Sequence, residues 1–414
     1  MKILLVNHYA TPPSRPGGTR HFSLAKALAE RGHQPLVVAS AFDHLTRTSC
    51  LDAAQAPRRE QHGPVPFLWL PAPGYRGNAG AARLRNMLAF ARAVERVAEQ
   101  LDFRPDVVVG SSPHLFAARA ALRLARRLDV PFVLEIRDVW PQSLVEVMGV
   151  SRWHPIVWLM ALIERQLYRE ADHIVTLLPA IGDRVRERGG DAGAITWVSN
   201  GIDLNLVPPV PELEEGDPFT FMYAGAHGLT NALDVMLDAA ALLQERQARL
   251  ARRVRLVLLG TGPEKPRLEA RARAERLVLL TFLPPVAKRD VYGWLAQADA
   301  FWVSSHDTKL WQHGISFNKL FDFMAMARPT VVGLDSPVNP IREADCGITV
   351  RPGDPEAMAA GMERLLALEP EARQAMGRRG RAYVREHFDF RVLAARFEGA
   401  LRAAAGSREA DHAR

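Results

Sequence analysis

The chain has 414 residues, of which 48% are hydrophobic and 24% charged, and its formal net charge is +7. This composition excludes a collagen-like, low-complexity or largely disordered chain. The two cysteines, Cys50 and Cys346, exclude a disulfide framework and a zinc-finger spacing, and favour a reducing, cytoplasmic compartment. No apolar run approaches the roughly 20 residues of a membrane-spanning helix, so we expect neither a membrane span nor a cleaved signal peptide.

Short apolar strands alternate with amphipathic helices from the first residues onward. We predict strands at 2–8, 34–40, 106–112, 131–138 and 173–178, and helices at 20–33, 81–101, 113–128 and 153–171. Such alternation is typical of a parallel sheet with helices on both faces. The basic excess lies mostly in residues 1–205, where it favours an anionic partner, with scattered solvated arginine as the alternative.

A Pro- and acid-rich stretch at 208–218 interrupts the pattern, which then restarts. We predict strands at 219–225, 254–260, 277–283, 299–305 and 329–334, separated by helices, with helices at 354–368 and 370–403 closing the chain. The chain therefore divides into a first domain (1–207), a second (208–385), a C-terminal helix that packs back on the first domain (386–405) and a disordered tail (406–414).

In open parallel sheets, ligands bind beyond the carboxyl ends of the strands. Gly17 and Gly18 follow the first strand and allow backbone amides to approach a diphosphate or a sugar; a plain turn is the alternative. Arg137 and Asp138 end an apolar strand, which predicts a catalytic carboxylate near an acceptor hydroxyl and a phosphate-binding guanidinium, or else an ion pair. His114 ends the neighbouring strand and is a further catalytic candidate, with a structural role as its alternative.

The strongest signal is the run from Gly314 to Ala325. Its amides lie at a predicted helix start, and a lysine in the first turn makes a good diphosphate seat. A carboxylate three residues later lies on the same helix face and can accept both hydroxyls of a ribose, although a surface ion pair is the alternative. The candidate donor-binding residues here are Ile315, Ser316, Phe317, Asn318, Lys319 and Asp322.

Small-residue turns after other strands complete the candidate nucleotide site. Gly225 and Gly262 follow two strands of the second domain, where small loops bring amides against phosphate. Leu283 follows a third strand and presents backbone groups to a base edge. Asn200 closes the first domain, where a tight turn is the alternative.

Taken together, these motifs resemble glycosyltransferase family 4. The resemblance rests on Tyr-x-Gly at 223–225, Gly-Thr-Gly-Pro at 260–263, the run Ser-Phe-Asn-Lys-Leu-Phe-Asp-Phe-Met-Ala-Met-Ala-Arg-Pro at 316–329 and the Arg-Asp-Val-Trp-Pro segment at 137–141, and it spans nearly the whole chain. It is closest to the branch of fucosamine and N-acetylaminosugar transferases of O-antigen and capsule assembly.

The resemblance implies the α/β GT-B fold, with two Rossmann-like domains facing across a deep cleft. It implies a retaining transfer from a UDP-sugar that needs no metal or other cofactor, in which Lys319 binds the diphosphate and Asp322 the ribose. Three departures stand out: Gly314 replaces the first acid of the family's E-x7-E signature, His227-Gly228-Leu229 replaces the usual cationic run, and Arg137 replaces a histidine.

An apolar stretch at 151–164 carries Trp153 and Trp158, and a helix of the same domain carries Arg83 and Arg85. Tryptophan with arginine is typical of helices that lie on anionic lipid, although a core-facing helix fits as well. We therefore expect a polyprenyl-diphosphate-linked sugar as acceptor, met at the inner face of the cytoplasmic membrane.

Other functions remain open at this stage. A UDP-sugar epimerase of the same fold, or a non-catalytic nucleotide-sugar-binding protein, would share most of these motifs. A nicotinamide oxidoreductase is disfavoured because Gly260-Thr261-Gly262 lacks the third glycine of a dinucleotide fingerprint. Nucleic-acid binding is disfavoured because the charge is dispersed and no known module is present.

Overall fold

The computed structural model describes residues 1–15, 17–44, 46–75, 80–210, 215–287, 290–314 and 316–412. The chain forms two compact units, which we call unit 1 (residues 1–200 and 390–414) and unit 2 (residues 201–389). The division falls at 200 and 390 rather than at the predicted 207 and 385.

Unit 1 is built on an eight-stranded sheet of order β3-β4-β2-β1-β5-β6-β7-β8. All neighbours pair in parallel except β3 and β4, which form a hairpin. The strands are β1 (Lys2–Val6), β2 (Gln34–Ser40), β3 (Arg58–His62), β4 (Val65–Leu70), β5 (Val107–Ser111), β6 (Phe132–Ile136), β7 (His173–Thr176) and β8 (Ile195–Trp197). Sequence reasoning predicted neither strand of this hairpin: the polar residues of β3 read as a loop, and the apolar run of β4 was not assigned to a strand.

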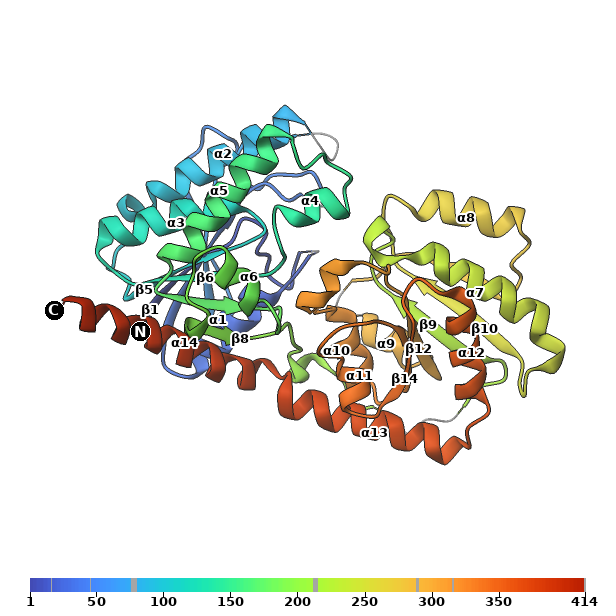
Figure 1. Ribbon diagram of the computed structural model, residues 1–414. Helices are drawn as coiled ribbons and strands as arrows, with labels where there is room; N and C mark the ends of the chain where they lie inside the picture. Colours follow the sequence, from blue (N-terminus) through green and yellow to red (C-terminus); the bar gives the residue numbers. More distant parts are fainter. Residues whose placement is uncertain are drawn as a thin grey trace. The chain divides into compact units, whose positions relative to one another are not determined.

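Helices cover both faces of this sheet (Figure 1). On one face, α1 (Arg20–Glu30) and α14 (Phe390–His412) share a core with alternate residues of the strands. On the other lie α2 (Ala81–Glu95), α3 (Leu115–Leu128) and α5 (Pro155–Glu170), while the short α4 (Gln142–Glu146) and α6 (Gly182–Glu187) follow β6 and β7. Because Gly110 has no side chain, α3 packs closely on β5: a Cβ there would lie 3.0 Å from the Cβ of Ala121.

Unit 2 contains a six-stranded parallel sheet of order β11-β10-β9-β12-β13-β14. Its strands are β9 (Phe219–Ala224), β10 (Val254–Leu259), β11 (Leu280–Leu283), β12 (Ala300–Val303), β13 (Thr330–Gly333) and β14 (Gly347–Val350). The helices are α7 (Leu233–Arg246), α8 (Lys265–Ala274), α9 (Val291–Leu295), α10 (Asn318–Ala325), α11 (Pro340–Glu343), α12 (Pro355–Leu366) and α13 (Pro370–His387). The core joins α7 and α12 to one face, and α10 packs against α13.

The two parallel-sheet α/β domains are thus as predicted, but the C-terminus differs. The expected helix 370–403 is two helices, because the backbone leaves helical geometry at Phe388 (φ −129°). The second, α14, belongs to unit 1, where Leu393, Ala394 and Phe397 enter the core. The expected disordered tail continues this helix as far as His412.

In each sheet the first parallel strand has later strands on both sides, β1 between β2 and β5, and β9 between β10 and β12, so the chain moves away from it in both directions across the sheet. Loops diverge at such a point and leave room for a ligand at the carboxyl ends of the strands. The loops after β1, β5 and β6, and after β9, β10 and β12, are therefore where the sites of the two units are to be sought.

Candidate functional site

A pocket of about 670 Å³ opens at the carboxyl ends of the unit 1 strands. Arg137 and Asp138, directly after β6, line it together with Gly17 and Gly18. The loops are close: a Cβ at Gly18 would lie 3.9 Å from Nη2 of Arg137. The structure therefore brings the two predicted unit 1 motifs to one cavity.

Asp138 is exposed on the pocket wall, and no described residue forms a hydrogen bond with its carboxylate. Surrounding protein nevertheless desolvates this group and raises the pKa of Asp138, while the charge of Arg137 opposes the shift. The backbone N–H of Arg137 donates to Ser112 Oγ (2.8 Å), which fixes the end of β6 against the end of β5. The result is an unbonded carboxylate beside a guanidinium, held on rigid strands.

A buried charge network lies beneath this wall, and sequence reasoning missed it. Glu135, fully buried in β6, accepts hydrogen bonds from Arg20 Nε (2.9 Å), His21 Nε2 (2.7 Å) and Ser111 Oγ (2.6 Å). Burial alone would raise the pKa of Glu135, but the charges of His21 and Arg20 hold it well below the usual range. Arg20 also donates to the carbonyls of Val198 and Ser199, so the network ties α1, β5, β6 and the chain after β8 together.

The available signal was Glu135 itself, a charge inside an otherwise apolar strand. A charge so placed is almost always paired, and Arg20 at the start of the first helix was its natural partner. Asn200, the predicted donor-binding residue of this region, is buried in the chain after β8, where Ser199 Oγ donates to its carbonyl oxygen (2.6 Å).

His114 lies behind the pocket wall, at the start of α3. It is buried, caps α3 by accepting the backbone N–H of Ala117 at Nδ1 (2.8 Å), and stacks on His8 with ring centroids 4.7 Å apart. Burial lowers the pKa of His114 to about 3. Its neighbours Pro113 and Phe116 line the pocket, whereas His114 does not. This placement fits the structural alternative for His114.

The tryptophans of the 151–164 stretch face outward. Trp153 is 79% exposed and Trp158 67% exposed, while the opposite face of α5 is buried through Val157, Met160 and Ile163. The alternative of a core-facing helix is therefore wrong for the tryptophans. Arg83 and Leu84, at the start of α2, line the pocket, and Arg85 is exposed beside them.

In unit 2, Lys319 lies in the first turn of α10 in a neutral cage. Its Nζ donates to Asn231 Oδ1 (2.6 Å) and Tyr223 Oη (3.0 Å), and lies 5.1 Å from the ring centre of Phe317. No carboxylate pairs with it in the described part of unit 2. Burial lowers the pKa of Lys319 to about 7. A buried lysine without a carboxylate partner, at the N-terminus of a helix, is a favourable place for an anionic ligand to bind.

The glycine loops of unit 2 pack on each other. A Cβ at Gly260 would lie 2.0 Å from the carbonyl oxygen of Gly225, and one at Gly262 would lie 2.2 Å from that of His227. The two loops are joined by the N–H of His227 donating to Thr261 O (2.8 Å). Gly225 also borders the lysine, since a Cβ there would lie 3.1 Å from Lys319 Cε. Close packing of two loops is thus the first reason for these glycines, and Gly225 borders the candidate anion site as well.

Asp322 does not pair with Lys319 as the surface-pair alternative required. Its Oδ1 accepts a hydrogen bond from Tyr292 Oη of α9 (2.8 Å). Asn318 opens α10 after Phe317, its N-cap, and Ser316 precedes them; Ile315 lies outside the described residues. A ribose at Asp322 would share or displace the Tyr292 hydroxyl.

The carbonyl of Leu283 is already used. It accepts from Lys265 Nζ (2.6 Å) and from the backbone N–H of Gly260 (3.3 Å). The prolines that follow, Pro284 and Pro285, have no N–H to offer. The predicted contact of this carbonyl with a base edge would therefore need Lys265 to move.

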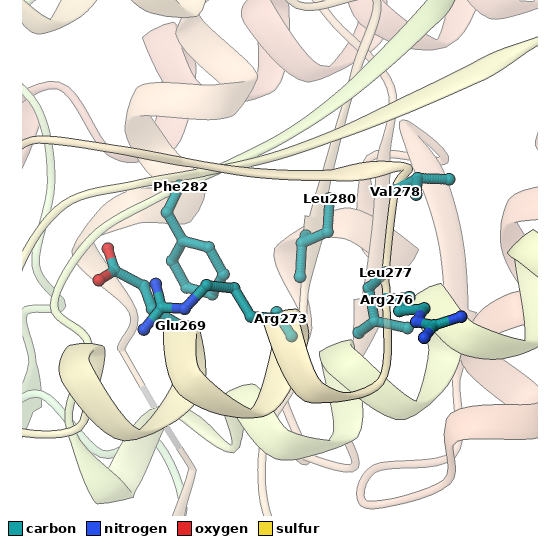
Figure 2. Close-up of a pocket in the computed structure, with 8 residues that line it drawn as sticks. Glu269, Arg273, Arg276, Leu277, Val278, Leu280 and Phe282 are labelled. Carbon is teal, nitrogen blue, oxygen red and sulfur yellow. The ribbon is translucent and has the colours of Figure 1, made fainter.

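A second, shallower cavity of about 420 Å³ lies at the edge of the unit 2 sheet (Figure 2). Phe282 and Leu280 point from β11 toward α8, which contributes Glu269 and Arg273. None of the predicted site residues lines it.

Among the described residues no group of three or more His, Cys, Asp or Glu side chains is placed to hold a metal ion. The described helices also include none with the length and apolarity required to cross a membrane.

Two family models match the chain. A glycosyl transferase 4-like domain covers residues 17–201, and a glycosyl transferases group 1 domain covers residues 218–368. Among curated relatives, D-inositol 3-phosphate glycosyltransferase of Saccharomonospora viridis is 29% identical over 243 residues, covering 55% of this chain and 54% of the relative, about half its length. The putative colanic acid biosynthesis glycosyl transferase WcaI of Escherichia coli is 21% identical over 285 residues, covering 65% of this chain and 68% of the relative.

Solved structures agree on the fold. Sucrose-phosphate synthase from Thermosynechococcus elongatus superposes with a TM-score of 0.75 at 17% identity, covering 97% of this chain and 98% of that one. Anabaena Alr3699/HepE, solved in complex with UDP and glucose, gives a TM-score of 0.65 at 16% identity, covering 97% and 99%. The chain therefore contains a glycosyl transferase 4-like domain followed by a glycosyl transferases group 1 domain, with a parallel sheet in each unit, and it has the GT-B fold.

Proposed function

We propose that the protein transfers a sugar from a UDP-sugar to an acceptor hydroxyl with retention of configuration. The observation that carries the proposal is the cage of Lys319: a lysine without a carboxylate partner in the described unit, at the N-terminus of α10 and beside Gly225. The Anabaena protein that shares this fold was solved with UDP, which supports the choice of nucleotide.

Unit 2 acts on the leaving group. As the bond between the sugar's anomeric carbon and the diphosphate breaks, the electron pair stays on the diphosphate oxygen, and the ammonium of Lys319 and the free amides at the start of α10 stabilise that charge. Asp322 takes the ribose hydroxyls. We propose that no divalent cation is needed, because a lysine and helix amides supply the positive charge that a metal would otherwise provide.

Unit 1 acts on the acceptor. The acceptor oxygen bonds to the anomeric carbon and its proton passes to the carboxylate of Asp138, whose pKa is raised toward the range useful for a general base. Arg137 orients the acceptor or the donor phosphate. The buried Arg20–Glu135–His21 network holds the end of β6 in place.

The finer assignment is an N-acetylaminosugar moved to a polyprenyl-diphosphate-linked sugar in O-antigen or capsule assembly. It is supported by the family resemblance and by the similarity to a transferase of colanic acid biosynthesis. We further propose peripheral contact with the inner face of the cytoplasmic membrane, supported by the outward face of α5, where Trp158, Leu159 and Leu162 are exposed alongside Arg165 and Arg169.

A thermal-shift panel of nucleotides and nucleotide sugars tests the donor. A ligand that binds the folded state raises its melting temperature. We expect UDP and a UDP-N-acetylaminosugar to raise it and NAD to leave it unchanged. A shift with NAD but not with UDP would overturn the proposal.

Product analysis separates transfer from its two alternatives. Epimerisation of the UDP-sugar without acceptor would identify an epimerase. UDP-sugar binding without turnover of any prenyl-linked acceptor would identify a binding protein. This outcome is worth testing because Gly314 stands where the family's E-x7-E signature has its first acid.

A further inference from the structure

The pocket of unit 1 is lined by many residues besides Asp138, Arg137 and the glycine loop. Most of that wall is apolar, contributed by α2, by α4 and the chain after it, and by α5: Leu84, Met87, Leu144, Met148, Val150 and Met160. A sugar alone would leave these side chains facing water or polar hydroxyls, whereas an apolar chain against them would gain roughly 25 cal/mol for each Å² buried. The pocket chemistry therefore fits a ligand with both a polar and an apolar part.

This apolar wall continues onto the protein surface. Met148 lines the pocket and is itself 53% exposed, and Leu84 is 36% exposed. A few residues further along the chain come Trp153 and Trp158, the two exposed tryptophans. A chain leaving the pocket past Met148 would thus reach the surface that we propose to contact lipid.

Arg83 supplies positive charge at the same pocket. It lies one residue before Leu84 and hydrogen-bonds the side chain of Tyr9, another lining residue. Its neighbours His44 and His8 have pKa values lowered chiefly by burial and in part by the charge of Arg83, so both rings are neutral at pH 7. An anion entering here would meet a full guanidinium charge beside neutral imidazoles.

We propose that this pocket is a prenyl-diphosphate site: Arg83 binds the diphosphate of the acceptor, and the wall of Leu84, Met148 and Val150 binds its first prenyl units. The acceptor sugar lies toward Asp138, the diphosphate at Arg83, and the chain leaves past Met148 toward the tryptophans. The inference rests on the proposed lipid-linked acceptor and assigns it a place.

The test is calorimetric titration of the full-length protein with farnesyl diphosphate below its micelle concentration, and separately with inorganic diphosphate. Saturating UDP is present in both, so that the donor site of unit 2 is occupied. We expect farnesyl diphosphate to bind at least about tenfold more tightly than inorganic diphosphate, because only the former buries the apolar wall. Equal affinities, or no binding of farnesyl diphosphate, would overturn the proposal.

Two variants locate the binding. Arg83→Ala should weaken farnesyl diphosphate binding about tenfold or more, the size of one charge-assisted hydrogen bond, and Met148→Glu should weaken it similarly by placing a charge in the chain's path. Arg92→Ala, an exposed arginine of the same helix, and Leu206→Glu, an exposed leucine of unit 2, serve as matched controls and should bind normally.

The outcomes separate this inference from the proposed function. Wild-type affinity in both Arg83→Ala and Met148→Glu would place the ligand elsewhere and overturn the site. In a further titration without UDP, loss of farnesyl diphosphate binding in Lys319→Ala would show that the ligand occupies the donor site and would overturn the assignment to unit 1. In either case an intact UDP-induced thermal shift of the wild-type protein would leave the donor assignment standing.

Discussion

At their candidate sites, the two units treat buried charge in opposite ways. Unit 1 pairs its deepest charges with one another, with Glu135 held by Arg20, His21 and Ser111. Unit 2 keeps Lys319 among a tyrosine, an asparagine and a phenylalanine, with no described acid to pair with it. A paired buried charge fixes the backbone segments that carry the two partners. An unpaired buried charge instead favours binding of a ligand of opposite charge.

The units also differ in which groups face the ligand and which groups hold those facing groups in place. In unit 1 the paired network lies beneath the site, and the groups that face the pocket, Arg137 and Asp138, are left open. In unit 2 the lysine itself is the facing group, and the support comes from two loops packed at Gly225, Gly260 and Gly262. Four substitutions and the pH dependence of UDP binding test this difference.

The largest effect is expected at the open carboxylate. Asp138→Asn should lower kcat by about 10²–10⁴-fold, the usual contribution of a general base, while UDP still raises the melting temperature. Asp183→Asn, an exposed aspartate of the same unit, is the control. Normal transfer by Asp138→Asn would end its catalytic assignment.

Breaking the paired network should act on stability instead. Glu135→Gln leaves Arg20 buried without its counter-charge and should lower the free energy of unfolding by about 3–5 kcal/mol, measured by urea denaturation. The pKa of Glu135 is lower in the folded state than in the unfolded state, where it is about 4.3. The stabilisation by the Glu135 carboxylate is therefore fully present above the unfolded-state pKa and is lost as the pH falls through the folded-state pKa. A stability unchanged from that of the exposed control Glu99→Gln would show that the network does not hold the fold together.

Removing the unpaired lysine should act on binding and leave stability almost intact. Lys319→Met should weaken UDP binding by about 10–100-fold, since a charge-assisted hydrogen bond contributes roughly 1.5–3 kcal/mol. Arg364→Ala, an exposed cation of the same unit, should bind UDP normally. UDP affinity preserved in Lys319→Met would move the diphosphate away from α10.

The pH dependence of UDP binding sharpens the same contrast. The pKa of Lys319 is about 7 in the free protein, and a bound diphosphate favours the charged form, so binding is at full strength below pH 7 and takes up a proton above it. The Kd should rise by up to about tenfold for each pH unit above 7 until the pKa of the complex is passed. Titrations at several pH values should show this slope in the wild type and lose it in Lys319→Met.

The smallest effect concerns the outward face of α5. Trp158→Glu should reduce cosedimentation with vesicles containing phosphatidylglycerol by several-fold to about tenfold, the free energy of withdrawing one large apolar side chain from lipid. Val278→Glu, at an apolar position of unit 2 that is more exposed than Trp158 (80% against 67%), should cosediment as the wild type does. Equal loss in both variants would mean that the binding is not specific to α5.

Much of this architecture could be predicted from the sequence, and some of it could not. Apolar runs at strand spacing predicted most of the parallel strands, and the motifs after β1, β6, β9 and β10 were found because such loops carry unusual glycines and charges. Neither strand of the β3–β4 hairpin was predicted: the edge strand Arg58–His62 is polar, and the apolar run Val65–Leu70 was not assigned to a strand. For His114, position after a strand leaves open whether the ring faces a ligand or caps a helix, and the cap is seen only in the structure.

The strand and helix pattern, the two parallel-sheet domains and the glycines and charges at the carboxyl ends follow from the sequence, because periodicity and the composition of buried strands specify them. Which charges meet depends on the fold: Glu135 pairs with Arg20 from a distant helix, and Lys319 meets Tyr223 and Asn231 rather than Asp322. The outward orientation of Trp153 and Trp158 likewise appears only in the structure. Pairing depends on distances across the fold, and neighbours along the chain do not set those distances.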